Sequence, residues 1–140
     1  MATEHSLPQL IGCLKSADWA ERFHAAFSLG RLGETAKAAV PALVETLKDD
    51  DPHVRKAAAV ALCNIGPDAC GAVPALCEAL RNDEEPAVRR RAAVALGEIG
   101  AEAAIPALEE AYLHDDNEQL QEEIAAALAE IESRALDAAA

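Results

Sequence analysis

The sequence predicts an all-α protein built from four consecutive helix pairs, and three observations support this. Alanine supplies 34 of the 140 residues and leucine 16, whereas valine and isoleucine together number 13 and aromatic residues make up 3%. That composition favours helices over sheets. Apolar residues make up 51% of the chain, which is enough for one packed domain. Proline recurs at spacings of 33, 33 and 32 residues, at Pro8, Pro41, Pro74 and Pro106.

Each of these prolines opens a first helix, and a second helix follows after a short acidic loop. The first helices read LPQLIGCL, VPALVETL, VPALCEAL and IPALEEAY. The second helices read ERFHAAFSLGRLG, VRKAAAVALCNIG, VRRRAAVALGEIG and LQEEIAAALAEI. The expected repeats cover about 7–38, 39–71, 72–103 and 104–131, with a helical tail over 132–140, in a single domain spanning 1–140.

The apolar residues of the second helices have helical spacing. In the second repeat, Val54, Ala58, Ala61, Leu62 and Ile65 fall at i, i+4, i+7, i+8 and i+11. One such pair of short helices cannot bury its apolar face alone, whereas stacked pairs form a continuous core. The sequence therefore predicts an α-solenoid, or α-α superhelix, of eight helices.

Residues with capping preferences stand at the expected helix ends. Ser6 and Gln9 form a possible capping box at the first helix. Short polar or acidic residues precede the second helices, and prolines suit the first helical position of two of them. Glycines follow the second helices, where a left-handed C-terminal cap is usual. The expected N-caps of the second helices are Asp18, Asp51, Glu85 and Asn117. The prolines are Pro52 and Pro86, and the glycines at the C-terminal ends are Gly33, Gly66 and Gly100.

The segments VRKAAAVALCNIG and VPALCEALRNDEEPAVRRRAAVALGEIG resemble the short HEAT-like repeats first recognised in phycobilisome lyases, and the similarity covers nearly the whole chain. The resemblance implies an armadillo-like scaffold that mostly binds other proteins. It also implies a ladder in which an acidic residue before each second helix works with an arginine four positions later. The matching residues are Asp18 with Arg22, Asp51 with Arg55, and Glu85 with Arg89, whereas the fourth repeat has Asn117 and Gln121 and so lacks both charges.

The resemblance places the second helices on the inner surface, where Trp19, Phe23 and Phe27 share one stripe at i, i+4 and i+8. This stripe lies almost opposite the expected core stripe. Along the aligned positions the inner face passes from aromatic through basic and aliphatic to acidic. The expected partner-binding residues are Trp19, Phe23, His24, Phe27, His53, Lys56, Val60, Arg90, Arg91, Val94 and Glu98.

Two interpretations of the aromatic stripe remain open. It is a docking or self-association surface, because contiguous exposed apolar residues usually mark an interface. Alternatively, Trp19 and Phe23 pack beneath the N-terminal segment as a cap.

The charge of the chain limits its partners. The formal net charge is −13, and residues 92–140 carry 12 acidic residues against one basic residue. The balance predicts no nucleic-acid partner, because phosphate backbones are repelled. The acidic C-terminal third of the chain, residues 92–140, either attracts a basic partner or keeps an alanine-rich helix soluble. No apolar run is long enough to span a bilayer and no signal sequence is evident, so we expect a cytoplasmic protein without a membrane partner.

No catalytic residue, metal site or cofactor is predicted. The four histidines occupy different repeat positions with no shared face, and the chain lacks the His-Glu dipeptide of the HEAT-like deoxyhypusine hydroxylases. The acidic loops lack the EF-hand pattern, so capping and solubility are preferred to calcium binding. The cysteines are expected to be free thiols. Cys13, Cys63 and Cys77 are expected to act as small buried hydrophobic residues, Cys63 at a small-residue packing position, and Cys70 is expected to be exposed.

The predicted function is that of a non-catalytic interaction scaffold or adaptor that binds another protein or peptide on the concave face of the second helices. Self-association through the aromatic stripe is a further possibility. The alternative function is that of a phycobilisome lyase-like accessory subunit, acting on the attachment of a bilin to a phycobiliprotein.

Overall fold

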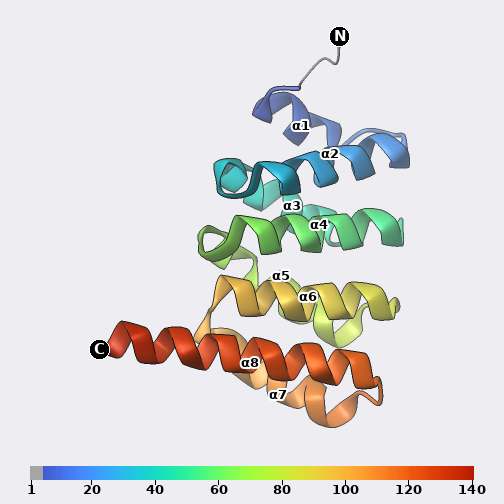
Figure 1. Ribbon diagram of the computed structural model, residues 1–140. Helices are drawn as coiled ribbons and strands as arrows, with labels where there is room; N and C mark the ends of the chain where they lie inside the picture. The colour runs from blue at the N-terminus through green and yellow to red at the C-terminus, as the bar shows by residue number, and fades with distance from the viewer. Residues whose placement is uncertain (1–4) are drawn as a thin grey trace.

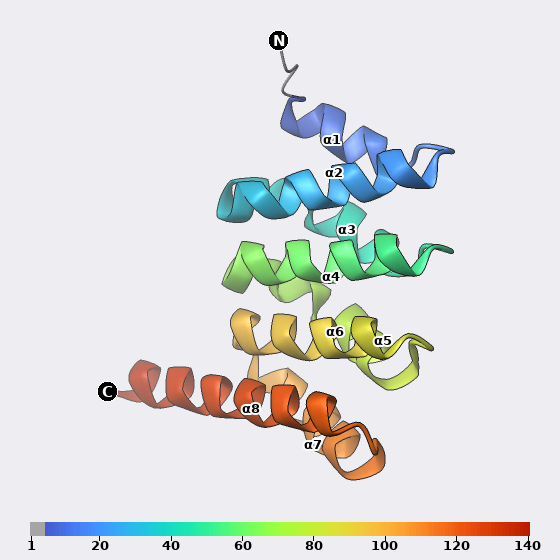
Figure 2. The same ribbon diagram turned by 45° about the vertical axis from the view of Figure 1, so that its right-hand side comes forward.

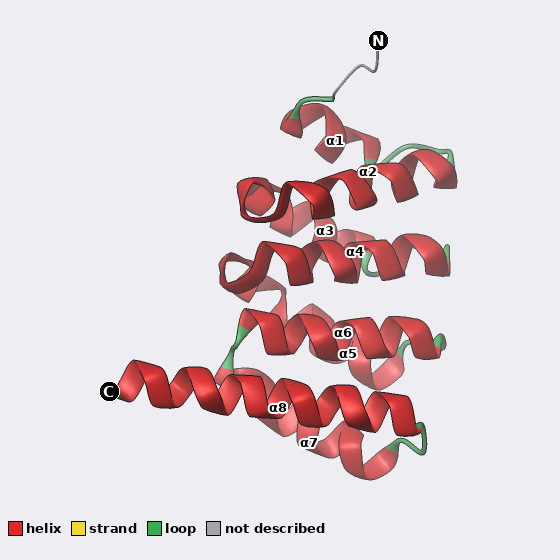
Figure 3. Ribbon diagram, viewed as in Figure 1, coloured by secondary structure: helices red, strands yellow, loops and turns green. Residues whose placement is uncertain are grey.

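The computed structural model describes residues 5–140, and within this range it contains eight α-helices, three 3₁₀ helices and no strand (Figure 3). The first helices are α1 (Leu7–Cys13), α3 (Val40–Thr46), α5 (Val73–Asn82) and α7 (Ile105–His114). The second helices are α2 (Trp19–Leu32), α4 (Pro52–Ile65), α6 (Pro86–Ile99) and α8 (Glu118–Ala139). The 3₁₀ helices η1 (Gly33–Ala39), η2 (Gly66–Ala72) and η3 (Glu102–Ala104) lead from each second helix to the next first helix.

The helices form two layers, and the predicted α-solenoid is confirmed. Figures 1 and 2 show α2, α4, α6 and α8 stacked one above another, with α3, α5 and α7 behind them and α1 above α2 at the N-terminal end. Successive second helices pack directly against each other along the stack. The first helices α1 and α3 reach the next repeat mainly through the 3₁₀ helices. The second-helix layer is therefore the more tightly packed of the two.

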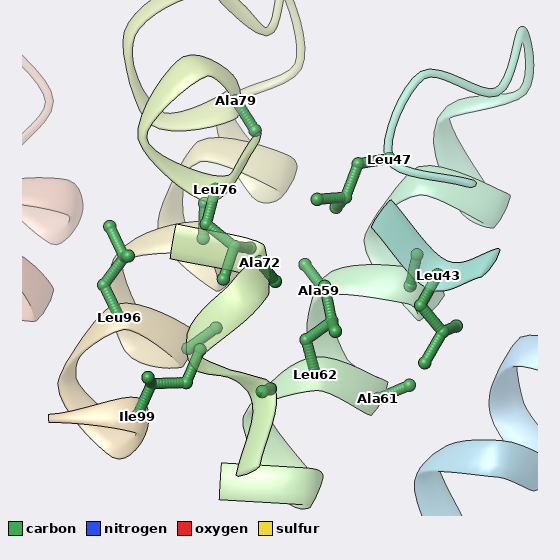
Figure 4. Close-up of a cluster of buried hydrophobic side chains, with 14 of the residues drawn as sticks. Leu43, Leu47, Ala59, Ala61, Leu62, Ala72, Leu76, Ala79, Leu96 and Ile99 are labelled. Atoms are coloured by element: carbon green, nitrogen blue, oxygen red, sulfur yellow. The ribbon is translucent and has the colours of Figure 1, made fainter. Parts of the chain in front are cut away.

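The core consists of leucine, isoleucine and alanine side chains repeated from pair to pair. Leu62, Leu76 and Leu96 are fully buried, and Ile99 is nearly so. Figure 4 shows these residues gathered between α4, α5 and α6. Burying a large aliphatic side chain contributes about 1.5–3 kcal/mol, so each added repeat extends one continuous core.

Small residues allow the second helices to approach closely. A Cβ atom placed on Gly97 would lie 2.8 Å from the Cα atom of Ala127, and one on Gly30 would lie 3.3 Å from the Cα atom of Ala61. Glycine is therefore required by packing at position 97 and is favourable at position 30. Cys63 occupies the aligned position in α4.

The expected N-terminal caps are mostly present. Ser6 and Gln9 form the capping box of α1. Asp18, Asp51 and Asn117 accept hydrogen bonds from backbone N–H groups in the first turns of α2, α4 and α8. Glu85 makes no side-chain cap bond to α6, so this expected cap was wrong. The longer glutamate side chain suits the N-cap position less well than aspartate or asparagine.

The glycines that end the second helices adopt two conformations rather than the one expected. Gly100 is left-handed as predicted, with φ 75° and ψ 21°. Gly33 and Gly66 also have positive φ, 58° and 75°, but their ψ values are −133° and −142°. This region is accessible almost exclusively to glycine. With this conformation the chain continues directly into η1 and η2. The prediction of a left-handed cap was therefore wrong at Gly33 and Gly66.

A ladder of arginines runs along the edge formed by the loops that precede the second helices. Each arginine donates from Nε to an aspartate of the following repeat, and from Nη1 to a carbonyl of the loop before its own helix. The Nε to Oδ2 distances are 2.8, 2.9 and 3.2 Å for Arg22 with Asp49, Arg55 with Asp83, and Arg89 with Asp115. One guanidinium therefore ties two successive repeats together.

The middle pair of the ladder is the most buried. The side chains of Arg55 and Asp83 are 10% and 7% exposed, whereas those of Arg89 and Asp115 are 18% and 23% exposed. The hydrogen bond to Asp83 raises the pKa of Arg55 above its ordinary value, although burial acts in the opposite direction. The charged form of Arg55 is thus part of the folded structure.

The acidic members of the ladder differ from those that the HEAT resemblance implied. Asp18 and Asp51 cap their own helices, and Glu85 pairs with no arginine among residues 5–140. The arginine on each second helix points toward the neighbouring repeat, so its partner is the aspartate two residues before the next expected N-cap. That aspartate also accepts the backbone N–H at the expected N-cap position.

The fourth repeat keeps part of the ladder without the arginine. Gln121 donates from Nε2 to the carbonyls of Asp115 and Tyr112, at 3.0 and 3.1 Å. It therefore makes the loop contacts that the arginines make through Nη1. The implied loss of a whole ladder pair at Asn117 and Gln121 was wrong, because the partners belong to different repeats and Asp115 keeps its pair with Arg89.

One stretch, Pro52–Asn82, is long and apolar enough to pass for a membrane span by length and composition alone. In the structure it comprises α4, η2 and α5, and the chain turns at Gly66. Half of its most apolar window is buried in the stack, so packing between core helices accounts for its hydropathy.

Candidate partner-binding site

An apolar groove lies between α2 and α4 on the second-helix face. Its volume is about 350 Å³, and most of its surface is contributed by apolar side chains. Three groups with basic or titratable character, Arg31, His53 and Lys56, stand around it. The other lining residues are Phe23, Ala26, Phe27, Gly30, Ala57, Val60, Ala61 and Asn64.

The aromatic stripe of α2 borders this groove and extends beyond it. Phe23 and Phe27 are stacked with their ring centroids 6.2 Å apart. Trp19 stands beside the groove, with its ring 6.0 Å from that of His53 on α4. The exposed fractions of Trp19 and Phe27 are 49% and 52%.

The expectation that all three rings point away from the interior was wrong for Phe23. This ring is half-buried and packs against the hydrophobic core. The same ring also lines the groove. A cap made by residues 1–4 lies outside the described residues.

His24 lies on a different surface from the groove residues with which it was predicted. It lines a hollow of about 370 Å³ between α1 and α2, together with His5, Cys13 and Glu21. The expectation that no two histidines share a face was therefore wrong. Residues 5–140 nevertheless contain no group of three or more His, Cys, Asp or Glu side chains placed to hold a metal ion.

Basic side chains lie on α4 and α6. Lys56 on α4 lines the groove against α2, and Arg90 on α6 donates from Nη1 to Oε1 of Gln119 on α8 at 3.0 Å. Burial and, to a lesser extent, Glu98 raise the pKa of Cys63 on α4 to about 11, against the opposing effect of Arg91. Arg91 and Glu98 therefore act on the α4–α6 junction from α6.

A shallower, acidic hollow of about 160 Å³ lies between α6 and α8. Val94, Glu98, Glu123 and Glu130 are among its lining residues. Arg134 crosses this junction. It donates from Nε to Glu130 at 3.0 Å, its Nη2 lies 3.5 Å from Glu98, and its Nη1 donates to the Glu98 carbonyl.

The predicted residues thus fall into groups along one face, with His24 outside them. Phe23, Phe27, His53, Lys56 and Val60 line the first groove, and Trp19 adjoins it. Arg90 and Arg91 lie at the middle of the stack, and Val94 and Glu98 line the hollow against α8.

Sequence reasoning missed two side chains of this face. Arg31 continues the aromatic stripe with the same spacing of four residues, which would have identified it. Arg134 lies beyond the last aligned repeat position, so no repeat pattern pointed to it. Two of the cysteines expected to be buried, Cys13 and Cys63, are half-buried, whereas Cys77 is buried and Cys70 exposed as expected.

A larger hollow of about 520 Å³ lies at the loop edge between the second and third repeats. Its walls include Asp49, Arg55 and Asp83. These charged groups already serve the ladder, so their arrangement is explained by stacking.

The match of the sequence to a known family agrees with this geometry. A family profile of HEAT repeats matches residues 7–70 and 63–129. The chain belongs to the HEAT-repeat family. Its two matched segments overlap across α4 and η2, as expected for consecutive copies of one helix pair.

Solved structures similar to this HEAT-repeat protein include enzymes and designed binders. Human deoxyhypusine hydroxylase in complex with glycerol is 32% identical with a TM-score of 0.75, and the match covers 94% of this chain and 45% of that one. A designed armadillo repeat protein in complex with the peptide (KR)4 is 23% identical with a TM-score of 0.76, covering 89% and 64% of the two chains. This second similarity shows the fold alone.

The resemblance to phycobilisome lyases is also found at the level of structure. The complex of CpcE and CpcF of phycocyanin lyase from Nostoc sp. PCC7120 is 21% identical with a TM-score of 0.55. The match covers 93% of this chain and 66% of that one, and it shows the fold alone. The chain spans less than two thirds of the length of each of these three structures. A comparison with curated protein sequences finds no significant match.

Proposed function

We propose that this HEAT-repeat protein is a non-catalytic scaffold that binds a protein or peptide on its second-helix face. The groove between α2 and α4 is the anchor of this site, and it is the observation that carries the proposal. It is concave and mainly apolar, it is bordered by two half-exposed aromatic rings, and basic groups stand at its edge. Recognition pockets with these features usually receive apolar side chains of a partner.

Stacking of the helix pairs does not require aromatic residues on this face. At the positions of Phe23 and Phe27 the second repeat has Lys56 and Val60, and the third has Arg90 and Val94. The solenoid continues through all of these positions, so aromatic rings are not required there for the helix pairs to stack. The tighter packing of the second-helix layer favours placing it on the concave side of the superhelix.

The binding role agrees with what repeat proteins of this architecture do. A designed armadillo repeat protein with the same fold was solved with a bound peptide, which supports a peptide or a protein segment as the kind of partner. The hydroxylase and lyase similarities come from proteins of which this chain spans only part, and the chain lacks the His-Glu dipeptide of the HEAT-like deoxyhypusine hydroxylases. We therefore infer a binding role without catalysis, for a protein that works in the cytoplasm.

A selection from a random-peptide display library tests the proposal. The wild-type chain is the bait, and the affinity of the selected peptides is then measured for Phe27→Ala and Val60→Ala. Truncating a central contact of an apolar site costs about 2 kcal/mol, so we expect a loss of about thirtyfold for Phe27→Ala.

The control is Leu113→Ala, which removes an apolar side chain that is 77% exposed on α7, away from the groove. This variant is expected to bind the peptides as the wild type does. Peptides that bind both groove variants with unchanged affinity, while circular dichroism shows an intact fold, would contradict the proposal.

A further inference from the structure

The second-helix face changes its chemistry in three steps along the stack. The aromatic section is the α2–α4 groove with its rings. The basic section comprises Lys56, Arg90 and Arg91 across α4 and α6. The acidic section comprises Glu122, Glu123 and Glu130 on α8. The helices that carry these sections, α2, α4, α6 and α8, follow one another along the stack (Figure 1). The aromatic and basic sections meet at Lys56, which lines the α2–α4 groove.

The basic section carries charge that the fold itself does not neutralise. Helix α4 contains no acidic residue. Lys56 and Arg91 form no ion pair within residues 5–140, and Arg90 is bonded there to the neutral amide of Gln119. The nearby Glu98 is engaged by Arg134 at 3.5 Å. These cations therefore differ from the ladder arginines, which are all paired.

The acidic section has the opposite excess. From Glu118 to Glu130, α8 carries four carboxylates and no basic residue. Arg134 forms ion pairs with Glu130 and Glu98 and, within residues 5–140, with no other carboxylate. Glu122 and Glu123 have no cationic partner in the part of the chain that the structure describes, and Glu122 is exposed.

A second copy of the chain is a poor occupant of this face. About a twofold axis, two copies packed face to face run either parallel, so that each helix opposes its own equivalent, or antiparallel, so that α4 of one opposes α6 of the other. In the parallel arrangement the basic section faces a basic section and the acidic section faces an acidic one. In the antiparallel arrangement Lys56 faces Arg90, and the rings of α2 face the carboxylates of α8. Like-charge contacts of this kind oppose association. The occupant that complements all three sections is a different chain.

We propose that this face binds a bipolar peptide segment whose apolar, acidic and basic residues follow one another in that order from α2 to α8. The apolar residues enter the groove beside Phe27, the acidic residues meet Lys56, Arg90 and Arg91, and the basic residues meet Glu122 and Glu123. This inference rests on the proposed function and adds to it the order of charges that the partner must have.

Synthetic peptides of one composition and two charge orders test this inference. One carries an apolar block of leucine and phenylalanine, then glutamates, then lysines, and the other has the glutamate and lysine blocks exchanged. Each is made in both chain directions and contains no tryptophan, so the fluorescence of Trp19, the single tryptophan of the protein, reports binding next to the groove. Isothermal titration calorimetry at low salt gives the affinity.

We expect the apolar–acidic–basic order to bind about tenfold more tightly in one chain direction than either direction of the exchanged order, with the difference shrinking at high salt. The double variant Lys56→Glu with Glu122→Lys should reduce or reverse this preference. The matched control, Lys37→Glu on the exposed surface of η1, should preserve it.

Equal affinity for the two orders would overturn the bipolar partner while leaving the apolar anchor in place. Absence of binding by every peptide up to millimolar concentration would overturn both the bipolar partner and the proposed function. Sedimentation of the wild type as a dimer that Phe27→Ala converts to a monomer would assign the face to a second copy and would also overturn the inference.

Discussion

The loop edge and the second-helix face of this solenoid use the same repeat in opposite ways. Along the loop edge, equivalent positions carry the same kind of residue, an arginine and an aspartate, and make the same contacts at each of the three repeat junctions. Along the second-helix face, equivalent positions carry phenylalanine, lysine, arginine and glutamate. Repetition thus identifies residues that hold the stack together, and variation identifies those that are available to a partner.

The largest expected effect comes from breaking the ladder at its most buried point. Arg55→Met keeps the aliphatic stem but leaves the buried Asp83 carboxylate without its partner, so we expect a loss of about 3 kcal/mol in the free energy of unfolding. Urea denaturation followed by circular dichroism measures this loss. The control Arg31→Met removes an exposed arginine outside the ladder and should change stability little. An equal loss in the two variants would show that the ladder does not stabilise the stack.

The next effect concerns the contact beneath the second-helix face. Gly97→Ala places a Cβ atom 2.8 Å from the backbone of Ala127, so α6 and α8 must move apart. Even with the gain in helix propensity, we expect a loss of about 1–2 kcal/mol in unfolding free energy.

Gly30→Ala is the matched comparison, because its Cβ contact would be 3.3 Å rather than 2.8 Å. The helix-propensity gain should nearly offset that milder contact, leaving stability close to that of the wild type. Gly12→Ala, which meets no atom within 4 Å, controls for propensity alone. Equal stability of Gly97→Ala and Gly12→Ala would refute the close-packing explanation.

A smaller effect is expected from the pH dependence of the cap at the start of α4. Burial raises the pKa of Asp51, but hydrogen bonds from the amides of His53 and Val54 outweigh it and bring the pKa below its ordinary value of 3.8. The folded state therefore favours the ionised carboxylate. The resulting stabilisation is fully present above pH 3.8 and is lost as the pH falls through the pKa that Asp51 has in the folded state.

Asp51→Asn isolates this contribution, because asparagine keeps an oxygen for the two amides but carries no charge. We expect the stability difference between wild type and variant to shrink between about pH 4 and about pH 2, measured as urea midpoints at each pH. A difference that stays constant over this interval would show that the cap carries no charge-dependent stabilisation.

The smallest effect on stability is expected on the second-helix face itself. Phe27→Ala truncates a half-exposed ring, so we expect the unfolding free energy to change by no more than about 0.5 kcal/mol. Thermal denaturation of this variant beside Arg55→Met compares the two surfaces directly. A large loss for Phe27→Ala would assign the ring to the structural core instead of to a binding site.

Much of the fold was predictable because its signals are local. The N-cap role of Asp51 and the burial of Val54 follow from their own positions in one helix, and each signal recurs in two other repeats. The groove residues were partly predictable, since the stripe of Trp19 and Phe27 lies opposite the core stripe. Contacts between repeats were not predictable in the same way, because they depend on how far one helix pair is rotated and shifted against the next.

The sequence by itself determined that this chain forms stacked helix pairs and which surface varies from pair to pair, since periodicity and caps act within a helix. Only the tertiary structure decided that Arg55 reaches Asp83 instead of Asp51, that Phe23 packs against the core where it lines the α2–α4 groove, and that Arg134 crosses to Glu98. Each of these contacts joins residues about one repeat apart, and the geometry between neighbouring helices, which no local pattern encodes, selects the partner.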